Sequence, residues 1–231
     1  HMKKALSFLI MSAVCLFTQV NVKAEGLSLV GTLQYETEHY VRGLNYSDDA
    51  LGVGVNGSYD LGFANAFGGM YNVPRLGGND SVNHSVLGLS RSFELIGLTL
   101  DSSIEVQHHN AAVDSTEVGL GVSIPNLPLI GDYASVGLTL WDNQDIDYSG
   151  ITIDITGNPY DLPVLSDLSL TPYIELGSFD LHDYQKFGGT LNYNGLDSLS
   201  PYVNVFYLNS DDSPWGDENG ITVSAGINVS F

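Results

Sequence analysis

The chain has 231 residues, and its 43% of hydrophobic residues, with 13 Tyr and 9 Phe, is the composition of an ordered protein rather than a disordered one. It carries 7 Lys and Arg against 27 Asp and Glu, a formal charge of −20 at pH 7, which argues against nucleic acid as a partner because phosphate binding requires basic side chains. The single cysteine, Cys15, excludes a disulfide framework within the chain and a cysteine-based metal site.

The first 24 residues read as a leader. A remnant of cloning (residues 1–2) precedes two lysines, an apolar run over residues 5–17 and a small-x-small motif that ends at Ala24. The apolar run is shorter than the ~20 residues of a membrane-spanning helix. We predict a cleavable signal peptide up to residue 24 and one domain over residues 25–231. Four basic residues then remain against 27 acidic ones, a formal charge of −23.

From Glu25 onward, apolar and polar residues alternate in short segments, which is typical of strands with one apolar and one polar face. The third, fourth and eleventh segments are indistinct, so ten strands stay open beside twelve. The predicted strands are residues 27–43, 51–61, 64–73, 84–93, 98–109, 116–124, 133–141, 149–156, 168–179, 185–193, 201–208 and 221–231.

The last segment, residues 221–231, alternates most regularly. Its odd positions are apolar and its even positions are small or polar, and it ends in Phe231. Its length suits a transmembrane strand of about 9–11 residues. A closing strand with a terminal Phe resembles those of Gram-negative outer-membrane β-barrel proteins. The resemblance implies an antiparallel up-and-down transmembrane β-barrel in the cell outer membrane.

The connections between the segments fall into two alternating sets. One set is short or apolar, and the other is acidic and polar, as expected of periplasmic turns and outer loops. With an even number of strands, both termini are expected in the periplasm. The first set is residues 60–63, 94–97, 125–132, 157–167 and 195–199; the second is residues 45–50, 74–83, 109–115, 142–147, 180–183 and 209–220.

A soluble sandwich or lipocalin-like barrel also alternates, with its apolar face inward. The export signal and the terminal Phe favour the membrane form. In that form, aromatic residues near strand ends would make interfacial girdles, with core packing as the alternative role. These aromatic residues are Tyr35, Tyr59, Phe63, Tyr71, Phe93, Trp141, Tyr193 and Tyr207.

The segment Tyr40-Val41-Arg42-Gly43-Leu44-Asn45, the polar stretch through Asp49 and the Gly-alternating residues 52–59 form a further pattern. It resembles the opening hairpin of the TorF-type porin family, which has an aromatic-x-Arg-Gly motif followed by a polar loop. The aromatic residue usual before the Arg is Val41 here. The resemblance covers about the first forty residues after the leader and implies a small porin-like barrel, with no known substrate and no catalytic residues.

If the apolar faces contact lipid, the polar faces line the lumen. A barrel of about twelve strands is intermediate between side-chain-filled and wide-channel barrels, and an acidic lining favours cations. We therefore predict a narrow, cation-preferring diffusion channel. The expected pore-lining residues are the acids Glu36, Glu38, Asp101, Glu105, Glu117, Asp154 and Glu175 and the bases Arg42, Arg91 and Lys186.

Two other interpretations stay open. In the first, the acids pair with the three bases and their side chains fill the barrel. In the second, the barrel is a sealed structural or receptor protein that acts through its acidic outer loops. No G-x-S-x-G motif occurs, and His108 and His109 are adjacent and so point to opposite faces of a strand. We expect no enzyme activity, no metal site and no cofactor. The expected partners of this monomer are outer-membrane lipid, lipopolysaccharide and small hydrophilic solutes or ions.

Overall fold

The computed structural model describes residues 26–41, 44–74, 81–110, 115–126, 133–145, 148–163, 165–211 and 218–231; for residues 44–49, 74, 81 and 218 it describes the backbone. The predicted signal peptide, Arg42 and much of the acidic loop sequence lie outside this part of the chain. Within it there is no α-helix, and therefore none long and apolar enough to cross a membrane.

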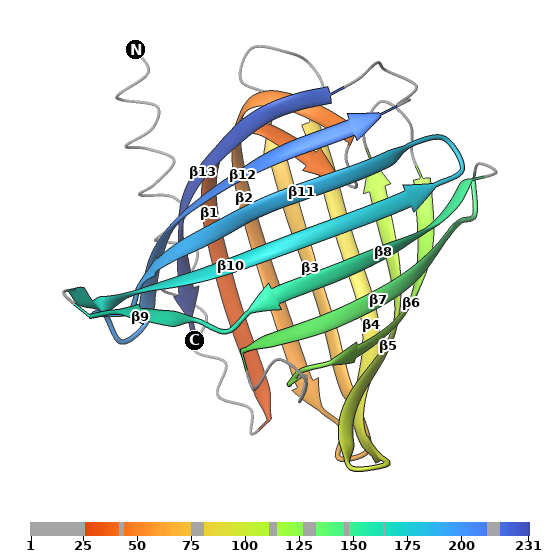
Figure 1. Ribbon diagram of the computed structural model, residues 1–231, viewed down its shortest axis with the longest axis horizontal. Helices are drawn as coiled ribbons and strands as arrows, with labels where there is room; N and C mark the ends of the chain where they lie inside the picture. Colours follow the sequence, from red (N-terminus) through yellow and green to blue (C-terminus); the bar gives the residue numbers. More distant parts are fainter. Residues whose placement is uncertain are drawn as a thin grey trace.

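Twelve long antiparallel strands form a closed barrel (Figure 1). The three indistinct segments are strands β3, β4 and β12, so twelve strands rather than ten is confirmed. A thirteenth strand, β9, has three residues and pairs only with the start of β10. The strands are β1 (Leu27–Val41), β2 (Leu44–Asp60), β3 (Asn65–Pro74), β4 (Ser81–Leu95), β5 (Leu98–Asn110), β6 (Ser115–Ile124), β7 (Ala134–Asn143), β8 (Tyr148–Gly157), β9 (Tyr160–Leu162), β10 (Leu165–Phe179), β11 (Asp183–Tyr193), β12 (Leu199–Asp211) and β13 (Glu218–Ser230).

The first and last strands close the sheet. β13 pairs with β1 from Val30↔Ser230 to Glu36↔Ser224 and with β12 along its whole length. Because neighbours in register share a face, the odd positions of β13 and of β1 as far as Glu36 face outward and the even positions face inward. Closure pairs the two edges of the sheet with each other, which is how an antiparallel sheet in a barrel wall satisfies its backbone polar groups.

The outward face is apolar along most strands, as the alternation predicts. Leu87, Leu120 and Ile221 on this face are each more than half exposed. The largest run is on neighbouring β4 and β5, where Leu87, Leu89, Phe93 and Leu95 lie opposite Val106, Ile104, Leu100 and Leu98. An apolar outer band of this kind is a feature of barrels surrounded by lipid.

Two aromatic residues predicted for the outer girdle face inward instead. Val55 pairs with Met70, so the outward positions of β3 are Ala66, Gly68 and Met70, and Tyr71 points into the lumen. Trp141 pairs with Gly119 and donates from Nε1 to Thr152 Oγ1 at 3.1 Å inside the barrel. The girdle prediction is therefore wrong for Tyr71 and Trp141. The assignment of apolar side chains to the outward face was wrong for β3, because the inward face of this strand carries aromatic rings.

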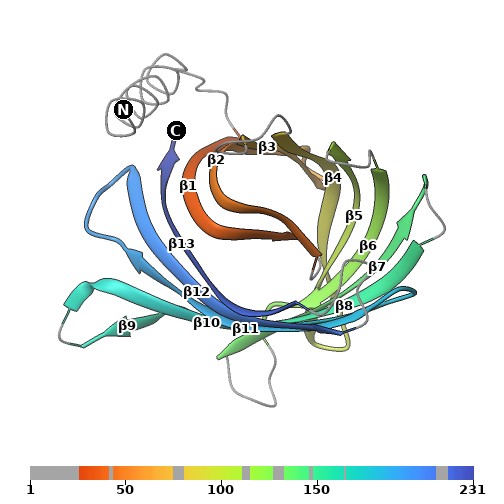
Figure 2. The same ribbon diagram turned by 90° about the horizontal axis from the view of Figure 1, so that it is seen from above.

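The β1–β2 hairpin leaves the barrel wall. Pairing of β1 with β13 ends at Glu36, and pairing of β2 with β3 begins only at Val53, whereas β1 and β2 stay paired with each other as far as Val41↔Leu44. Residues 45–50, predicted as a loop, are therefore part of β2. Figure 2 shows this end of both strands curving from the wall into the interior of the barrel. We call residues 37–41 and 44–52 the luminal hairpin.

Candidate functional site

The barrel interior carries the predicted pore-lining acids. The pairings Glu36↔Ser224, Glu105↔Gly119, Glu117↔Asn143 and Glu175↔Asp154 place both members of each pair on the inward face. Asp101, on β5, lies on the same face as Glu105, and Glu38 accepts a hydrogen bond from Thr222 Oγ1 inside the barrel at 3.1 Å.

The predicted bases are arranged differently. Lys186 pairs in register with Glu175 and faces inward. Arg91 is in the register of Leu89 and Phe93, so alternation directs its side chain to the apolar face of β4, although the residue borders a luminal cavity. Among the described side chains, Lys186 is thus the one Lys or Arg on the luminal face, which carries the seven predicted carboxylates and, at strand ends, Asp60 and Glu94. Arg42 lies outside the described residues.

Lys186 is held by several groups at once. Its Nζ lies 3.4 Å from Glu175 Oε2 and 4.7 Å from the centre of the Phe206 ring. Tyr184 donates from its hydroxyl to Glu175 Oε1 at 2.7 Å. This local pairing offsets one luminal carboxylate and leaves the luminal charge strongly negative.

A polar cavity of about 470 Å³ occupies the part of the lumen nearer the β4–β5 turn. Seven serine and threonine residues contribute to its lining, together with Asp101 and Asp154. Ser92 Oγ donates to Asp101 Oδ1 at 2.5 Å. Hydroxyls and carboxylates of this density suit water and hydrated ions better than an apolar solute.

The opposite part of the lumen is more densely filled. Tyr148, Phe179, Tyr184, Phe206 and Leu208 form a buried cluster on the inner wall from β8 to β12. Tyr40 of the luminal hairpin packs against this cluster, with its ring centre 6.2 Å from that of Phe206. On the other side of the hairpin, Ala50 packs with Val73 and Val82 of β3 and β4. The hairpin therefore contacts opposite inner walls and narrows this end of the lumen.

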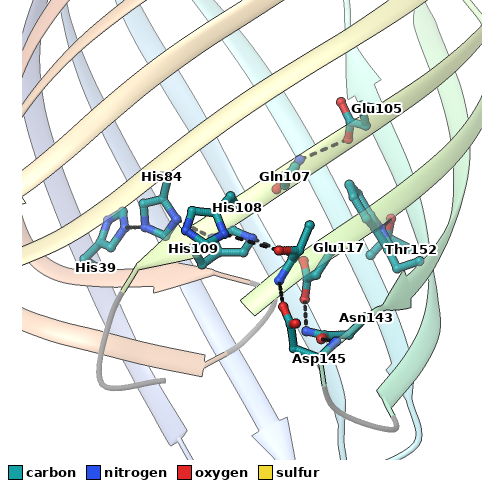
Figure 3. Close-up of polar contacts among 12 residues, drawn as sticks. His39, His84, Glu105, Gln107, His108, His109, Glu117, Asn143, Asp145 and Thr152 are labelled. Atoms are coloured by element: carbon teal, nitrogen blue, oxygen red, sulfur yellow. Dashed lines mark hydrogen bonds and ion pairs between the residues drawn. The ribbon is translucent and has the colours of Figure 1, made fainter. Parts of the chain in front are cut away.

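A continuous chain of polar contacts joins the hairpin to the wall (Figure 3). Glu36 Oε2 lies 2.9 Å from His39 Nδ1, and His39 Nε2 lies 2.9 Å from His84 Nε2. His84 Nδ1 lies 2.5 Å from His109 Nδ1, and the other ring nitrogen of His109, Nε2, lies 3.2 Å from Glu117 Oε2. Asn143 Nδ2 donates to Glu117 Oε1 at 3.3 Å. We call Glu36, His39, His84, His109 and Glu117 the histidine chain.

The histidine chain depends on the inward bend of the hairpin. In the wall, β1 and β4 are separated by β2 and β3, which is about 14 Å at a strand spacing of 4.7–4.9 Å. Imidazoles on strands that far apart could not touch. A β-bulge between His39 and Tyr40 accompanies the bend and directs His39 towards β4 and Tyr40 towards β12.

Sequence reasoning missed these three histidines. His39 is on the apolar side of its strand by simple alternation, and the three residues are contributed by β1, β4 and β5. One signal was available in the odd and even positions of the strands. His84 and His109 both lie on the inward face of their strands, and they pair directly in register. His108 faces outward and lies 3.3 Å from Thr116 Oγ1, so the predicted divergence of His108 and His109 is confirmed.

The histidine chain is linear rather than convergent. His84 uses its two ring nitrogens for two different neighbours, so the three rings do not point at a common centre. Over the described residues, no group of three or more His, Cys, Asp or Glu side chains is arranged to hold a metal ion.

No protein-family model matches the chain, and no curated protein sequence matches it. Among solved structures, it is similar to the KdgM porin over 87% of this chain and 99% of that one, with a TM-score of 0.56 and 12% sequence identity. A KdgM porin in complex with disordered oligogalacturonate gives a TM-score of 0.55 at 11% identity, covering 88% of this chain and 99% of that one.

An outer-membrane channel from Pseudomonas putida F1 is similar over 88% of this chain and 95% of its own, with a TM-score of 0.53 and 12% identity. At these identities the likeness concerns the fold, which is the closed antiparallel barrel of outer-membrane porins.

Proposed function

We propose that this protein is an outer-membrane channel for passive diffusion of small solutes, narrow and selective for cations. The proposal rests on one observation above all: among the described side chains, at least seven carboxylates and one lysine lie on the luminal face, and the lysine is paired with Glu175. Fixed negative charge in a confined pore lowers the energy of cations and raises that of anions. The luminal hairpin supports the narrowness, since it occupies one end of the lumen.

The proposed location is the cell outer membrane. The apolar outer face, the predicted signal peptide and the porin-like fold support the outer membrane of a Gram-negative bacterium, with both termini in the periplasm and with lipid and lipopolysaccharide around a monomer. The aromatic-x-Arg-Gly resemblance to TorF-type porins is compatible with this assignment. Oligogalacturonate, the ligand of one similar structure, is a polyanion, and the acidic lumen here opposes such a solute.

The test is single-channel recording of the purified protein in a planar bilayer under a KCl gradient. We expect a reversal potential that indicates cation preference and that moves towards zero in a variant with Asp101→Asn and Asp154→Asn, which removes the two carboxylates of the cavity. The matched control is Asp142→Asn, an exposed carboxylate on the outward face of β7. Anion preference, or the same shift in the control, contradicts the proposed selectivity.

A second candidate is a sealed barrel that acts through its acidic loops. The filled end of the lumen favours it, because Tyr40 packs onto the aromatic cluster and Ala50 packs onto Val73 and Val82. Conductance distinguishes the two candidates. A folded protein that inserts into bilayers without any conductance, at any pH, is a sealed barrel.

A further inference from the structure

The luminal hairpin is attached to the barrel mainly by side chains. Beyond Glu36 and before Val53 its backbone pairs with neither β13 nor β3. A hairpin of two strands is only marginally stable alone in water, so its position in the lumen depends on what its side chains contact. The attachments to β12, β3 and β4 through Tyr40 and Ala50 are apolar. Thr37 and Glu38 accept hydrogen bonds from β13 at the base of the hairpin, and His39 contacts His84 on β4.

The histidine chain has a defined requirement for protons. Four contacts link its five groups: Glu36 to His39, His39 to His84, His84 to His109 and His109 to Glu117. Each contact is a hydrogen bond only when one proton lies between its two atoms. Three neutral imidazoles carry three protons, which is one fewer than the four contacts require. The intact chain therefore holds a fourth proton, and its net charge is one unit more positive than that of three neutral rings with two ionised carboxylates.

Further protonation breaks the chain at its histidine–histidine contacts. A fifth or sixth proton places N–H against N–H and positive charge against positive charge at His39–His84 or at His84–His109. The outer contacts survive, because Glu36 and Glu117 still accept from His39 and His109. Of the two contacts that are lost, His39–His84 is the one that joins the hairpin to the wall.

Carboxylates and tyrosines surround the histidine chain. The described titratable groups that face it are Glu36 and Glu38 of β1, Tyr71 of β3, Glu105 of β5, Glu117 of β6, Asp145 after β7 and Tyr202 of β12. Histidine is the side chain whose charge ordinarily changes between about pH 5 and 8. A response in that window that is lost on substitution of His39 or His84 therefore belongs to the imidazoles.

We propose that the histidine chain is a proton-operated latch, which holds the luminal hairpin against β4 near neutral pH and releases it in acid. Release moves the hairpin away from the wall and widens this end of the lumen. The sign follows from the proton count in acid: the latched state binds four protons in the chain, the released state with all three imidazoles charged binds six, and the latched state therefore loses stability as the pH falls through the imidazole range. A difference of one pKa unit between the two states changes their ratio about tenfold.

The direct test measures a distance. Spin labels are placed at Val41→Cys in the hairpin and Ser85→Cys on the outward face of β4, in a Cys15→Ser background that leaves no other cysteine. In detergent or bilayers, pulsed electron resonance is expected to give a narrow distance distribution at about pH 7.5 that broadens and lengthens at about pH 5. A distribution that is the same at both values, or that narrows in acid, overturns the proposal.

A glutamine variant separates the latch from other effects of acid. Glutamine donates and accepts hydrogen bonds without titrating, so His84→Gln is expected to suppress most of the change between the two pH values, and His39→Gln is expected to do the same. The matched control, His108→Gln, removes a histidine from the outward face of β5 and should retain the wild-type response. Heat-modifiable gel mobility checks that each variant is folded. A full wild-type response in both His84→Gln and His39→Gln overturns the latch.

The conductance measurement rests on the proposed channel function, and the distance measurement does not. In a bilayer, we expect the open fraction of the wild type to rise about tenfold from about pH 7.5 to about pH 5, and that of His84→Gln to change little. A pH-dependent distance without any conductance leaves the latch in place and removes the channel. Conductance that is pH-independent, together with an unchanged distance, removes the latch and leaves the channel.

Discussion

Glycine on the luminal face makes space for aromatic rings of the neighbouring strand. An added Cβ at Gly177 would lie 2.0 Å from Tyr184 Cε1, and at Gly150 it would lie 2.2 Å from Phe179 Cδ1. The rings occupy the space beside these glycines and belong to the buried cluster that Tyr40 contacts. Alternation of glycine with apolar residues is visible in the sequence, but the partner ring is on another strand and could be identified only from the register.

Substitution of Gly177 by alanine is therefore expected to destabilise the barrel by about 1–3 kcal/mol, the usual cost of overpacking. Tyr184 has little freedom to move, since it is 2% exposed and its hydroxyl is bonded to Glu175. The control is Gly137→Ala, where the nearest atoms to the new Cβ are 3.6 and 3.8 Å away, an ordinary contact. Equilibrium unfolding by urea in lipid vesicles, monitored by gel mobility, gives the free energy of unfolding of the Gly177→Ala and Gly137→Ala variants. Equal stability of both variants contradicts the packing argument.

At the scale of elements, the luminal hairpin is the feature that alternation describes least well. Residues 45–50 are polar and acidic, and this composition predicted a loop. Backbone pairing with β1 continues through them because the hairpin is enclosed by the inner walls of β3, β4 and β12, which supply apolar contacts to Ala50 and Tyr40. A tertiary environment of this kind overrides local strand preference.

A shortened hairpin tests what this element does. Replacing residues 37–49 by the two-residue turn Asn-Gly keeps the pair Glu36↔Ala50 and gives β1 and β2 a tight turn that suits antiparallel strands. We expect the barrel to fold, because every wall pairing with β13 and β3 is retained, and we expect the single-channel conductance to increase several-fold as the lumen opens. Bilayer recordings measure it. Unchanged conductance in a folded variant would mean that the hairpin does not limit the pore.

At the scale of the whole molecule, the two faces of the barrel have opposite chemistry. The outward face exposes large apolar side chains, and the inward face gathers carboxylates and hydroxyls. This division was predictable from every clear strand, since it needs only the two-residue period of a strand and one decision about which face meets lipid. The same period placed Glu105, Glu117, Asp154 and Glu175 on one face before any register was known.

The outward face of β6 provides a test of lipid contact. Leu120 is in the middle of the strand and 52% exposed, so Leu120→Arg is expected to cost about 2–4 kcal/mol of folding free energy in a bilayer. On the same strand, Ser123 faces the cavity and pairs with Asp101, so Ser123→Arg is expected to cost less. Unfolding in lipid vesicles measures both changes. An equal or reversed order would mean that the apolar face is not the one in contact with lipid.

Sequence by itself predicted about twelve strands, with ten left open and with the boundaries of the first hairpin misplaced, and it predicted that their polar faces are acidic. These depend on the local two-residue period, which any stretch of chain shows without its neighbours. Only the tertiary structure decided the register of β3, the outward position of Arg91, the inward course of the β1–β2 hairpin and the meeting of His39, His84 and His109. Those features depend on which residues of different strands lie opposite one another and on where a hairpin leaves the wall, and alternation within a single strand carries no information about either.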